Sequence, residues 1–312
     1  MKALAIVFVC MFFVSLTGFA VSMAASDIRI EDVFRGNYTI GWSGDWDAYN
    51  VSREFKDSFS DIEIGILSAR TTIRVSQDGV ARVDYNGNRN FRNVEFIAEV
   101  RGNTLIIKER GTIRWSGNWS WGWNTGRTTL DIELPEDVYS KIIIDITSGS
   151  ISGDLPDTHD LDINVTSGNV TLRFDEDREQ RGNLKSRTTS GTVNVHGFNP
   201  DTYEVHSTSG TQNIHNLSGS GTLRLTSGRV NLNFDEWDGG LRVNVTSGSA
   251  SIALPEGGGA ELTFSRTSGS LSYSFGNDSG RLNSSGSRNI GGDNRQRVDV
   301  NITSGSVRIY GN

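Results

Sequence analysis

The sequence predicts an all-β protein whose main part is a β-solenoid, a β-helix-like stack of about nine rungs of ~20 residues each. The composition supports this class, because glycine is abundant at 36 residues, proline is scarce at 4, and Val, Ile and Thr are common. Two patterns add to it: the tripeptide Thr-Ser-Gly recurs at near-regular spacing, and apolar and polar residues alternate on both sides of it. The stack is expected over residues 141–312, preceded by a capping β region at 25–140.

The first 24 residues have the features of a secretory signal peptide. Lys2 precedes an apolar run from Ala3 to Ala20, and Ser22-Met23-Ala24 offers a small-x-small cleavage site. A retained membrane anchor is the alternative, because the run approaches the length of a short transmembrane span. Cleavage would remove Cys10, the only cysteine, and would leave neither a disulfide nor a membrane span. We therefore expect export to the periplasm, the cell surface or the medium.

Residues 25–140 lack the tripeptide but contain five segments with strand-like composition. Gln77-Asp78-Gly79 and Gly102-Asn103 mark hairpin turns between them. Because a solenoid end exposes unpaired backbone groups and needs a cover, we expect this region to cap the first rung. The five segments are Ile62–Leu67, Thr71–Val75, Val80–Tyr85, Val94–Val100 and Thr104–Lys108.

The same region contains a five-residue tryptophan-rich segment twice. The first copy is Trp42-Ser43-Gly44-Asp45-Trp46, and the second is Trp115-Ser116-Gly117-Asn118-Trp119. In an extended chain Trp119, Trp121 and Trp123 project from one face. They form a candidate ligand platform, on which indoles stack against sugar rings or anchor at an interface. The alternative is two hairpin tips whose indoles pack inside the cap, which is the commoner use of aromatic side chains.

The repeat is defined by its glycines, which lie 17 to 23 residues apart. Two and four residues after most of them the chain is apolar, and the residue between is always polar, which predicts a strand with one buried face. Each unit is then strand, corner, strand and connection, with glycine supplying the positive φ that a sharp corner often needs. The pattern weakens at 281–289, where we expect an irregular rung. The predicted corner glycines are Gly149, Gly168, Gly191, Gly210, Gly228, Gly248, Gly269, Gly286 and Gly305.

A second interpretation makes each tripeptide a hairpin loop, which gives an antiparallel β-sandwich. Aligned columns over nine units favour the solenoid, because stacked rungs use that alignment directly. The sequence ends at Tyr310-Gly311-Asn312, directly after the last predicted strand. An open edge there predicts self-association or partner binding through the C-terminal rung.

Few side chains suggest a metal-binding or catalytic site. His196 and His215 follow successive glycines by five residues and are expected to stack outward, with His206 between them in the sequence, but no carboxylate shows matching metal-ligand spacing. Asp175-Glu176 and Asp235-Glu236 share a rung position three rungs apart, roughly 14 Å, which is too far for either glycosidase geometry. We expect solvated side chains here, and neither a metal site nor a cofactor.

Catalytic motifs and nucleic-acid signals are also missing from the sequence. Neither a G-x-S-x-G elbow nor an S-x-x-K motif occurs. The formal net charge is −7, and losing Lys2 with the signal peptide makes it −8, so an exported chain of this kind is a poor nucleic-acid binder.

The run Ile132-Glu133-Leu134-Pro135 leads into Ile142–Gly149 and then into serial T-S-G-x-[IV] units. In these features, over residues 130–312, the chain resembles a bacterial family known as the "putative adhesin" family, a domain of unknown function. The resemblance implies an all-β repeat fold, an envelope or extracellular setting, and no catalytic residues. We therefore predict a non-enzymatic, adhesin-like binding or scaffolding protein that contacts an envelope polymer, a glycan or a protein. The alternatives are a carbohydrate-binding module that uses the tryptophans and a carbohydrate-active enzyme resembling the β-helical polysaccharide lyases.

Overall fold

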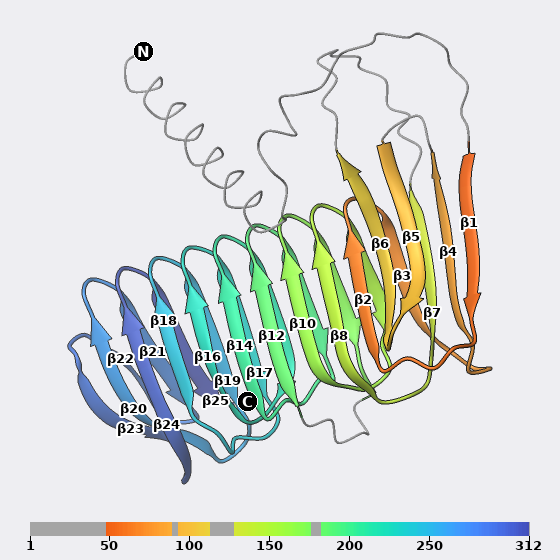
Figure 1. Cartoon of the computed structure of the whole chain (residues 1–312). Helices are drawn as coiled ribbons and strands as arrows, with labels where there is room; N and C mark the ends of the chain where they lie inside the picture. Colours follow the sequence, from red (N-terminus) through yellow and green to blue (C-terminus); the bar gives the residue numbers. More distant parts are fainter. Residues whose placement is uncertain (1–47, 89–92, 113–127, 176–181, 312) are drawn as a thin grey trace, which may run out of the picture.

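The chain folds into two large β-sheets that face each other along an elongated stack (Figure 1). The computed structural model describes residues 48–88, 93–112, 128–175 and 182–311. The predicted signal peptide, residues 1–24, lies outside this part. Within the described part, no helix has the length and apolar character needed to cross a membrane.

Within the described ranges, sheet A has thirteen strands and sheet B has twelve. The spatial order of sheet A is β1 (Ala48–Phe55), β4 (Ala81–Asn88), β7 (Thr129–Pro135), β3 (Arg70–Ser76), β9 (Ser150–Asp154), β11 (Asn169–Arg173), β13 (Thr192–His196), β15 (Thr211–Leu217), β17 (Arg229–Phe234), β19 (Ser249–Leu254), β25 (Ser306–Gly311), β21 (Ser270–Phe275) and β22 (Asp278–Leu282). The spatial order of sheet B is β23 (Gly286–Gly291), β20 (Gly258–Arg266), β24 (Asn294–Ile302), β18 (Leu241–Val245), β16 (Ser220–Leu225), β14 (Thr202–Ser207), β12 (Asn183–Thr188), β10 (Thr158–Val165), β8 (Tyr139–Ile146), β2 (Asp61–Ile66), β6 (Thr104–Thr112) and β5 (Asn93–Arg101).

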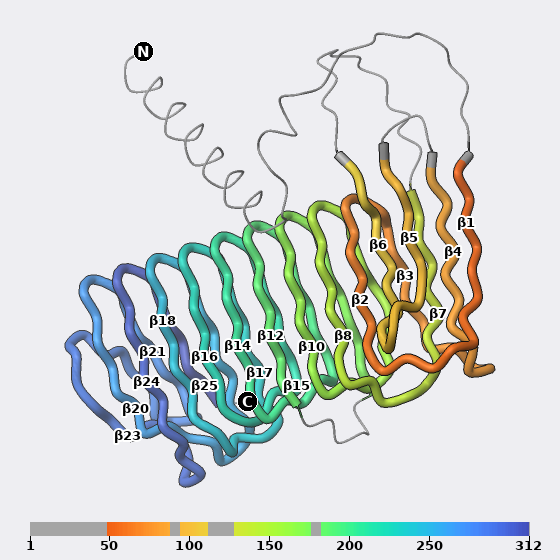
Figure 2. Tube along the Cα trace, viewed as in Figure 1, coloured from red at the N-terminus to blue at the C-terminus, as the bar shows by residue number. Residues whose placement is uncertain are grey.

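The predicted solenoid is confirmed by the pairing of its strands. The strands on the two sides of each Thr-Ser-Gly joint, such as β8 and β9, lie in opposite sheets and pair in parallel with the next rung. The antiparallel sandwich is wrong, because a hairpin joint would pair those two strands with each other. The tube trace shows the resulting winding, with the chain alternating between sheets (Figure 2).

Alternation within each strand builds the core. From Ile142 in β8 and from Leu161 in β10 every second residue is buried, and the register aligns Ile144 with Ile163 and Ile64. Because inward positions of successive rungs coincide, apolar columns run the length of the stack between the sheets. No rung can bury its apolar face alone, so stability is shared among neighbours.

Residues upstream of 140 do more than cover the stack. Strands β2 and β3 form a rung that pairs in parallel with β8 and β9, and β6 and β7 form another beyond it. The antiparallel strands β4, β5 and β1 then close this end. Both sheets therefore continue without interruption across residue 140.

The two predicted turns in this region have different outcomes. The turn at Gly102 joins β5 and β6 as an antiparallel hairpin, with a φ of 63° at the glycine, as predicted. Gly79 also has a positive φ of 73°. A hairpin there is wrong, however, because β7 lies between β3 and β4 and pairs with both.

The C-terminal end corrects a further prediction. The last rung, β24 and β25, is not an open edge: β24 lies between β18 and β20, and β25 lies between β19 and β21. The backbone of this rung is paired on both sides, so it offers no edge for self-association. Residues 281–289, predicted as an irregular rung, contribute instead to the antiparallel strands β22 and β23, which end the two sheets.

Candidate functional site

The Thr-Ser-Gly joints stack into a continuous corner along one side of the molecule. Each joint keeps its backbone hydrogen-bonded to its neighbour: Ser167 N donates to Thr147 O over 2.8 Å, and Ser190 N donates to Thr166 O over 2.8 Å. The spatial order follows the sheets, so Gly305 lies between Gly248 and Gly269. Gly286 is not a corner residue, because it lies in the antiparallel strand β23. The column thus contains Gly149, Gly168, Gly191, Gly210, Gly228, Gly248, Gly305 and Gly269.

Close approach of successive rungs, rather than backbone conformation, requires these glycines. A Cβ added to Gly168 would lie 2.4 Å from Gly149 O, and one added to Gly191 would lie 2.1 Å from Gly168 O. None of the eight has a φ in the positive region. The predicted need for positive φ at the corner is therefore wrong: the missing side chain leaves room for the neighbouring carbonyl.

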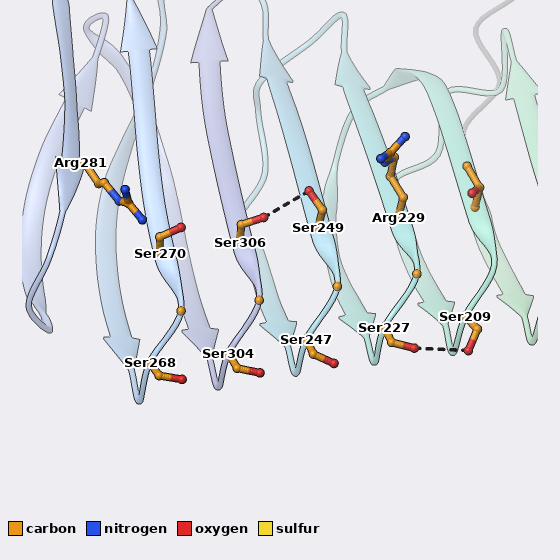
Figure 3. A pocket seen from close by; sticks show the side chains of 15 residues that line it. Ser209, Ser227, Arg229, Ser247, Ser249, Ser268, Ser270, Arg281, Ser304 and Ser306 are labelled. Atoms are coloured by element: carbon orange, nitrogen blue, oxygen red, sulfur yellow. Dashed lines mark hydrogen bonds between the residues drawn. The ribbon is translucent and has the colours of Figure 1, made fainter. Parts of the chain in front are cut away.

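The corner forms an open groove of about 780 Å³ over its C-terminal five rungs, which we call the serine groove (Figure 3). One wall is the row of joint serines, and the other is the row of residues that follow the glycines, with the small glycines between them. Successive rungs repeat at ~4.8 Å, so the groove presents hydroxyl groups at that interval. Its lining side chains are Ser209, Ser227, Ser247, Ser304, Ser268, Thr211, Arg229, Ser249, Ser306, Ser270 and Arg281.

Hydrogen bonds within the wall of joint serines fix the orientation of the serine hydroxyl groups. Ser227 Oγ donates to Thr208 O over 3.1 Å, Ser247 Oγ donates to Thr226 O over 3.2 Å, and Ser304 Oγ donates to Thr246 O over 3.1 Å. In the outermost rung Ser268 Oγ donates to Thr303 O over 3.1 Å. Each hydroxyl proton is thereby used inside the protein, and the remaining lone pairs can accept hydrogen bonds from the groove.

Among the described residues that line the groove, two arginines are the only ionisable side chains. Arg229 is on β17, and Arg281 is on β22, at opposite ends of the row Ser249, Ser306 and Ser270 (Figure 3). Both are exposed, and neither forms an ion pair within the described part of the chain. The groove therefore carries positive charge in a protein whose formal net charge is −7.

The predicted histidine pair forms on the outer face of sheet A. The rings of His196 and His215 stack with centroids 4.4 Å apart and an interplanar angle of 11°. Partial burial lowers the pKa of His215, the His196 ring lowers it further, and Asp235 opposes both. His206 is on β14 in the other sheet and is not part of the pair. The described residues bring no three His, Cys, Asp or Glu side chains together in a metal-binding group.

The other predicted candidates do not converge. Asp175 follows β11 and Asp235 follows β17, with β13 and β15 between those strands, and Asp235 Oδ2 accepts a hydrogen bond of 2.6 Å from Asn216 Nδ2. Glu176 and the platform residues Trp119, Trp121 and Trp123 lie outside the described residues, so the tryptophan platform stays a prediction.

Sequence reasoning missed the groove, although one signal was present. In the position directly after the corner glycine, Arg229 is the only charged residue among Ser, Thr and Asn. Arg281 gave no signal, because it reaches the groove from the antiparallel strand β22, which pairs Arg281 with Ser272.

The comparison with solved structures finds proteins from several bacteria. A "putative adhesin" from Bacteroides fragilis NCTC 9343 has 17% identity and a TM-score of 0.45 over 84% of this chain and 97% of its own. A "Putative lipid binding protein" from Parabacteroides distasonis ATCC 8503 has 17% identity and a TM-score of 0.47 over 83% and 96%. No curated protein matches the sequence. The model of the family described as "Toastrack DUF4097" matches residues 59–310, and the chain belongs to this family, a domain of unknown function.

Proposed function

We propose that the protein is an exported, non-enzymatic, adhesin-like binding protein that holds an extended polymer of the cell envelope along the serine groove. The observation that carries the proposal is the groove itself, in which equivalent hydroxyls repeat over five successive rungs. A linear ligand with repeating units suits such a surface, because each unit can make the same contact one rung further along. Export is supported by the signal-like residues 1–24.

The lining chemistry favours binding over catalysis. Glycoside hydrolysis needs two carboxyl groups on either side of the scissile bond, and the described residues that line the groove are Ser, Thr, Gly and Arg. Its serines have no histidine or lysine among the lining residues to activate them as nucleophiles. A lyase-like enzyme would need acidic and basic side chains that converge in one groove, whereas the charged residues among the described lining residues are two arginines.

Blocking the groove tests the proposal. The mature protein is measured for binding to a panel of neutral and acidic polysaccharides and to purified peptidoglycan. Ser247→Tyr places a large side chain in the groove, and Ser167→Tyr makes the same change at an exposed joint serine outside it. We expect at least one polymer to bind, with affinity reduced at least tenfold by Ser247→Tyr and less than twofold by Ser167→Tyr.

Two results would contradict the proposal. One is the absence of binding to every polymer on the panel, and the other is equal binding by wild type and Ser247→Tyr. Shortening of a polymer by the purified protein would contradict the non-enzymatic part. Trp121→Ala is measured alongside, because binding that depends on this residue would place the site on the tryptophan platform instead.

A further inference from the structure

The hydrogen-bonding state of the groove restricts the chemistry of its ligand. The hydroxyls of Ser227, Ser247, Ser304 and Ser268 donate to carbonyls within the wall, so toward the groove they act as acceptors. Acceptors pair with donors on the ligand, and sugar hydroxyl groups are donors that repeat along a polysaccharide. The rung interval of ~4.8 Å is close to the advance of an extended glycan per sugar.

The charge of the groove restricts the ligand further. Arg229 and Arg281 are separated by the strand sequence β17, β19, β25, β21 and β22, four steps that amount to roughly 19 Å. None of the described lining residues between them carries a carboxylate. An unpaired guanidinium binds carboxylate, sulfate or phosphate groups with charge-assisted hydrogen bonds, whereas neutral sugars gain little from it.

We propose that the groove selects an acidic polysaccharide, which lies across the rungs parallel to the stack axis with acidic groups at Arg229 and Arg281 and its hydroxyls on the joint serines Ser247, Ser304 and Ser268 of the rungs between them. This inference rests on the proposed function, since it names the polymer class that the same groove holds. The acidic net charge of the protein disfavours polyanions elsewhere on its surface, so the two arginines determine where the polymer binds.

The test compares two forms of one polymer, polygalacturonate and its methyl-esterified form, which share a backbone and differ in charge. Binding to the mature protein is measured by biolayer interferometry at low and high salt. The Arg229→Gln/Arg281→Gln variant removes both charges of the groove. Arg224→Gln/Arg242→Gln removes two exposed arginines of β16 and β18 in sheet B and is the matched control.

We expect the wild type to bind polygalacturonate about tenfold more tightly than the ester, which corresponds to about 1.4 kcal/mol. The groove variant should lose this preference and bind both forms equally, and the control should retain it within twofold. Added salt should weaken only the binding that depends on the two arginines.

The outcomes separate this inference from the function on which it rests. Suppose that Ser247→Tyr abolishes binding. If the wild type then binds both forms of the polymer equally, or if the two arginine variants have the same affinities, the groove binds polymer and the acidic preference is wrong. If Ser247→Tyr binds like wild type, the groove is not the site and both proposals fail. If neither polymer binds, the acidic-polysaccharide inference is overturned, while the broader panel still tests the function.

Discussion

Ser186 Oγ donates a hydrogen bond of 2.6 Å to Gln212 Oε1 across the core, from β12 in sheet B to β15 in sheet A. Both side chains are fully buried, and Gln212 Nε2 donates to His206 O over 2.7 Å. Their neighbours in the inward columns are apolar: Ile163 and Val205 lie beside Ser186, and Val193 and Val230 lie beside Gln212. The hydrogen bonds explain how the core accommodates the two polar side chains, because a buried polar group is tolerated when it has a partner.

Replacing one partner of this hydrogen-bonded pair should be relatively more destabilising than replacing both partners. Ser186→Val leaves Gln212 Oε1 without its donor, and we expect the free energy of unfolding to fall by about 1–3 kcal/mol. In Ser186→Val/Gln212→Val both positions become apolar, like their column neighbours, and the loss should be smaller than the sum of the single losses. Urea denaturation of the four proteins measures the coupling. Additive effects would show that the pair does not act as a unit.

The corner glycines and Gly286 should respond differently to alanine. In Gly191→Ala the new Cβ lies 2.1 Å from Gly168 O, so neighbouring backbone must move apart and the free energy of unfolding should fall by about 1–3 kcal/mol. In Gly286→Ala the new Cβ meets nothing within 4 Å, and the change should stay within about 0.5 kcal/mol. Thermal and urea denaturation compare the two. Equal effects would mean that rung spacing is not limited by the glycine column.

Glu109 completes the corner of the rung formed by β2 and β3. Its Oε2 accepts hydrogen bonds from the backbone nitrogens of Leu67 at 2.8 Å, Ser68 at 2.8 Å and Ala69 at 3.1 Å, and its Oε1 accepts one from Tyr85 Oη at 3.1 Å. In later joints a neighbouring rung's carbonyls accept from the corresponding threonine and serine nitrogens. The carboxylate of a buried side chain takes over this role at the first joint.

Removal of that carboxylate should break the hydrogen bonds that hold the backbone of the first joint in place. Glu109→Ala leaves three buried or half-buried backbone donors without this acceptor, and we expect the free energy of unfolding to fall by at least about 2 kcal/mol, together with faster amide exchange at residues 67–69. The exposed Glu95 on β5 supplies the control, Glu95→Ala. Unchanged exchange at residues 67–69 would contradict the assigned role.

The stacked histidines predict a pH dependence of stability. The pKa of His215 in the folded protein lies below its ordinary value of 6.5, chiefly because of burial and then because of His196. The unfolded chain therefore binds more protons as the pH falls through that value, and the free energy of unfolding should decrease below about pH 6.5. His215→Gln should flatten this dependence, and His206→Gln in the other sheet is the control. Stability that rises on acidification through this range would contradict the prediction.

The sequence allowed much of the fold to be predicted because its periodicity is strict. The segments Ile62–Leu67 and Thr104–Lys108 correspond closely to β2 and β6, since apolar and polar residues alternate there as the sheet requires. The joint glycines were found because a short motif recurs at a fixed place in the rung. The reason for them was missed, because contact with a neighbouring carbonyl depends on how rungs stack.

Spatial order could not be predicted where the chain order departs from it. Thr267-Ser268-Gly269 and Thr303-Ser304-Gly305 have the same motif, so nothing in either tripeptide shows that the second lies closer to Gly248. The serine groove was missed for a related reason. Arg281 reaches it only because β22 folds back against β21, a reversal that the repeat pattern does not encode.

The interior position of β24 and β25 has a consequence for biosynthesis. A ribosome releases β20 and β21 before it releases the two strands that must separate them from β18 and β19. Until β24 and β25 emerge, the nascent stack therefore retains a gap with exposed pairing groups on both sides. A chain without these two strands leaves that gap unfilled, so β20 and β21 can join the stack only after strands that follow them in the sequence have been made.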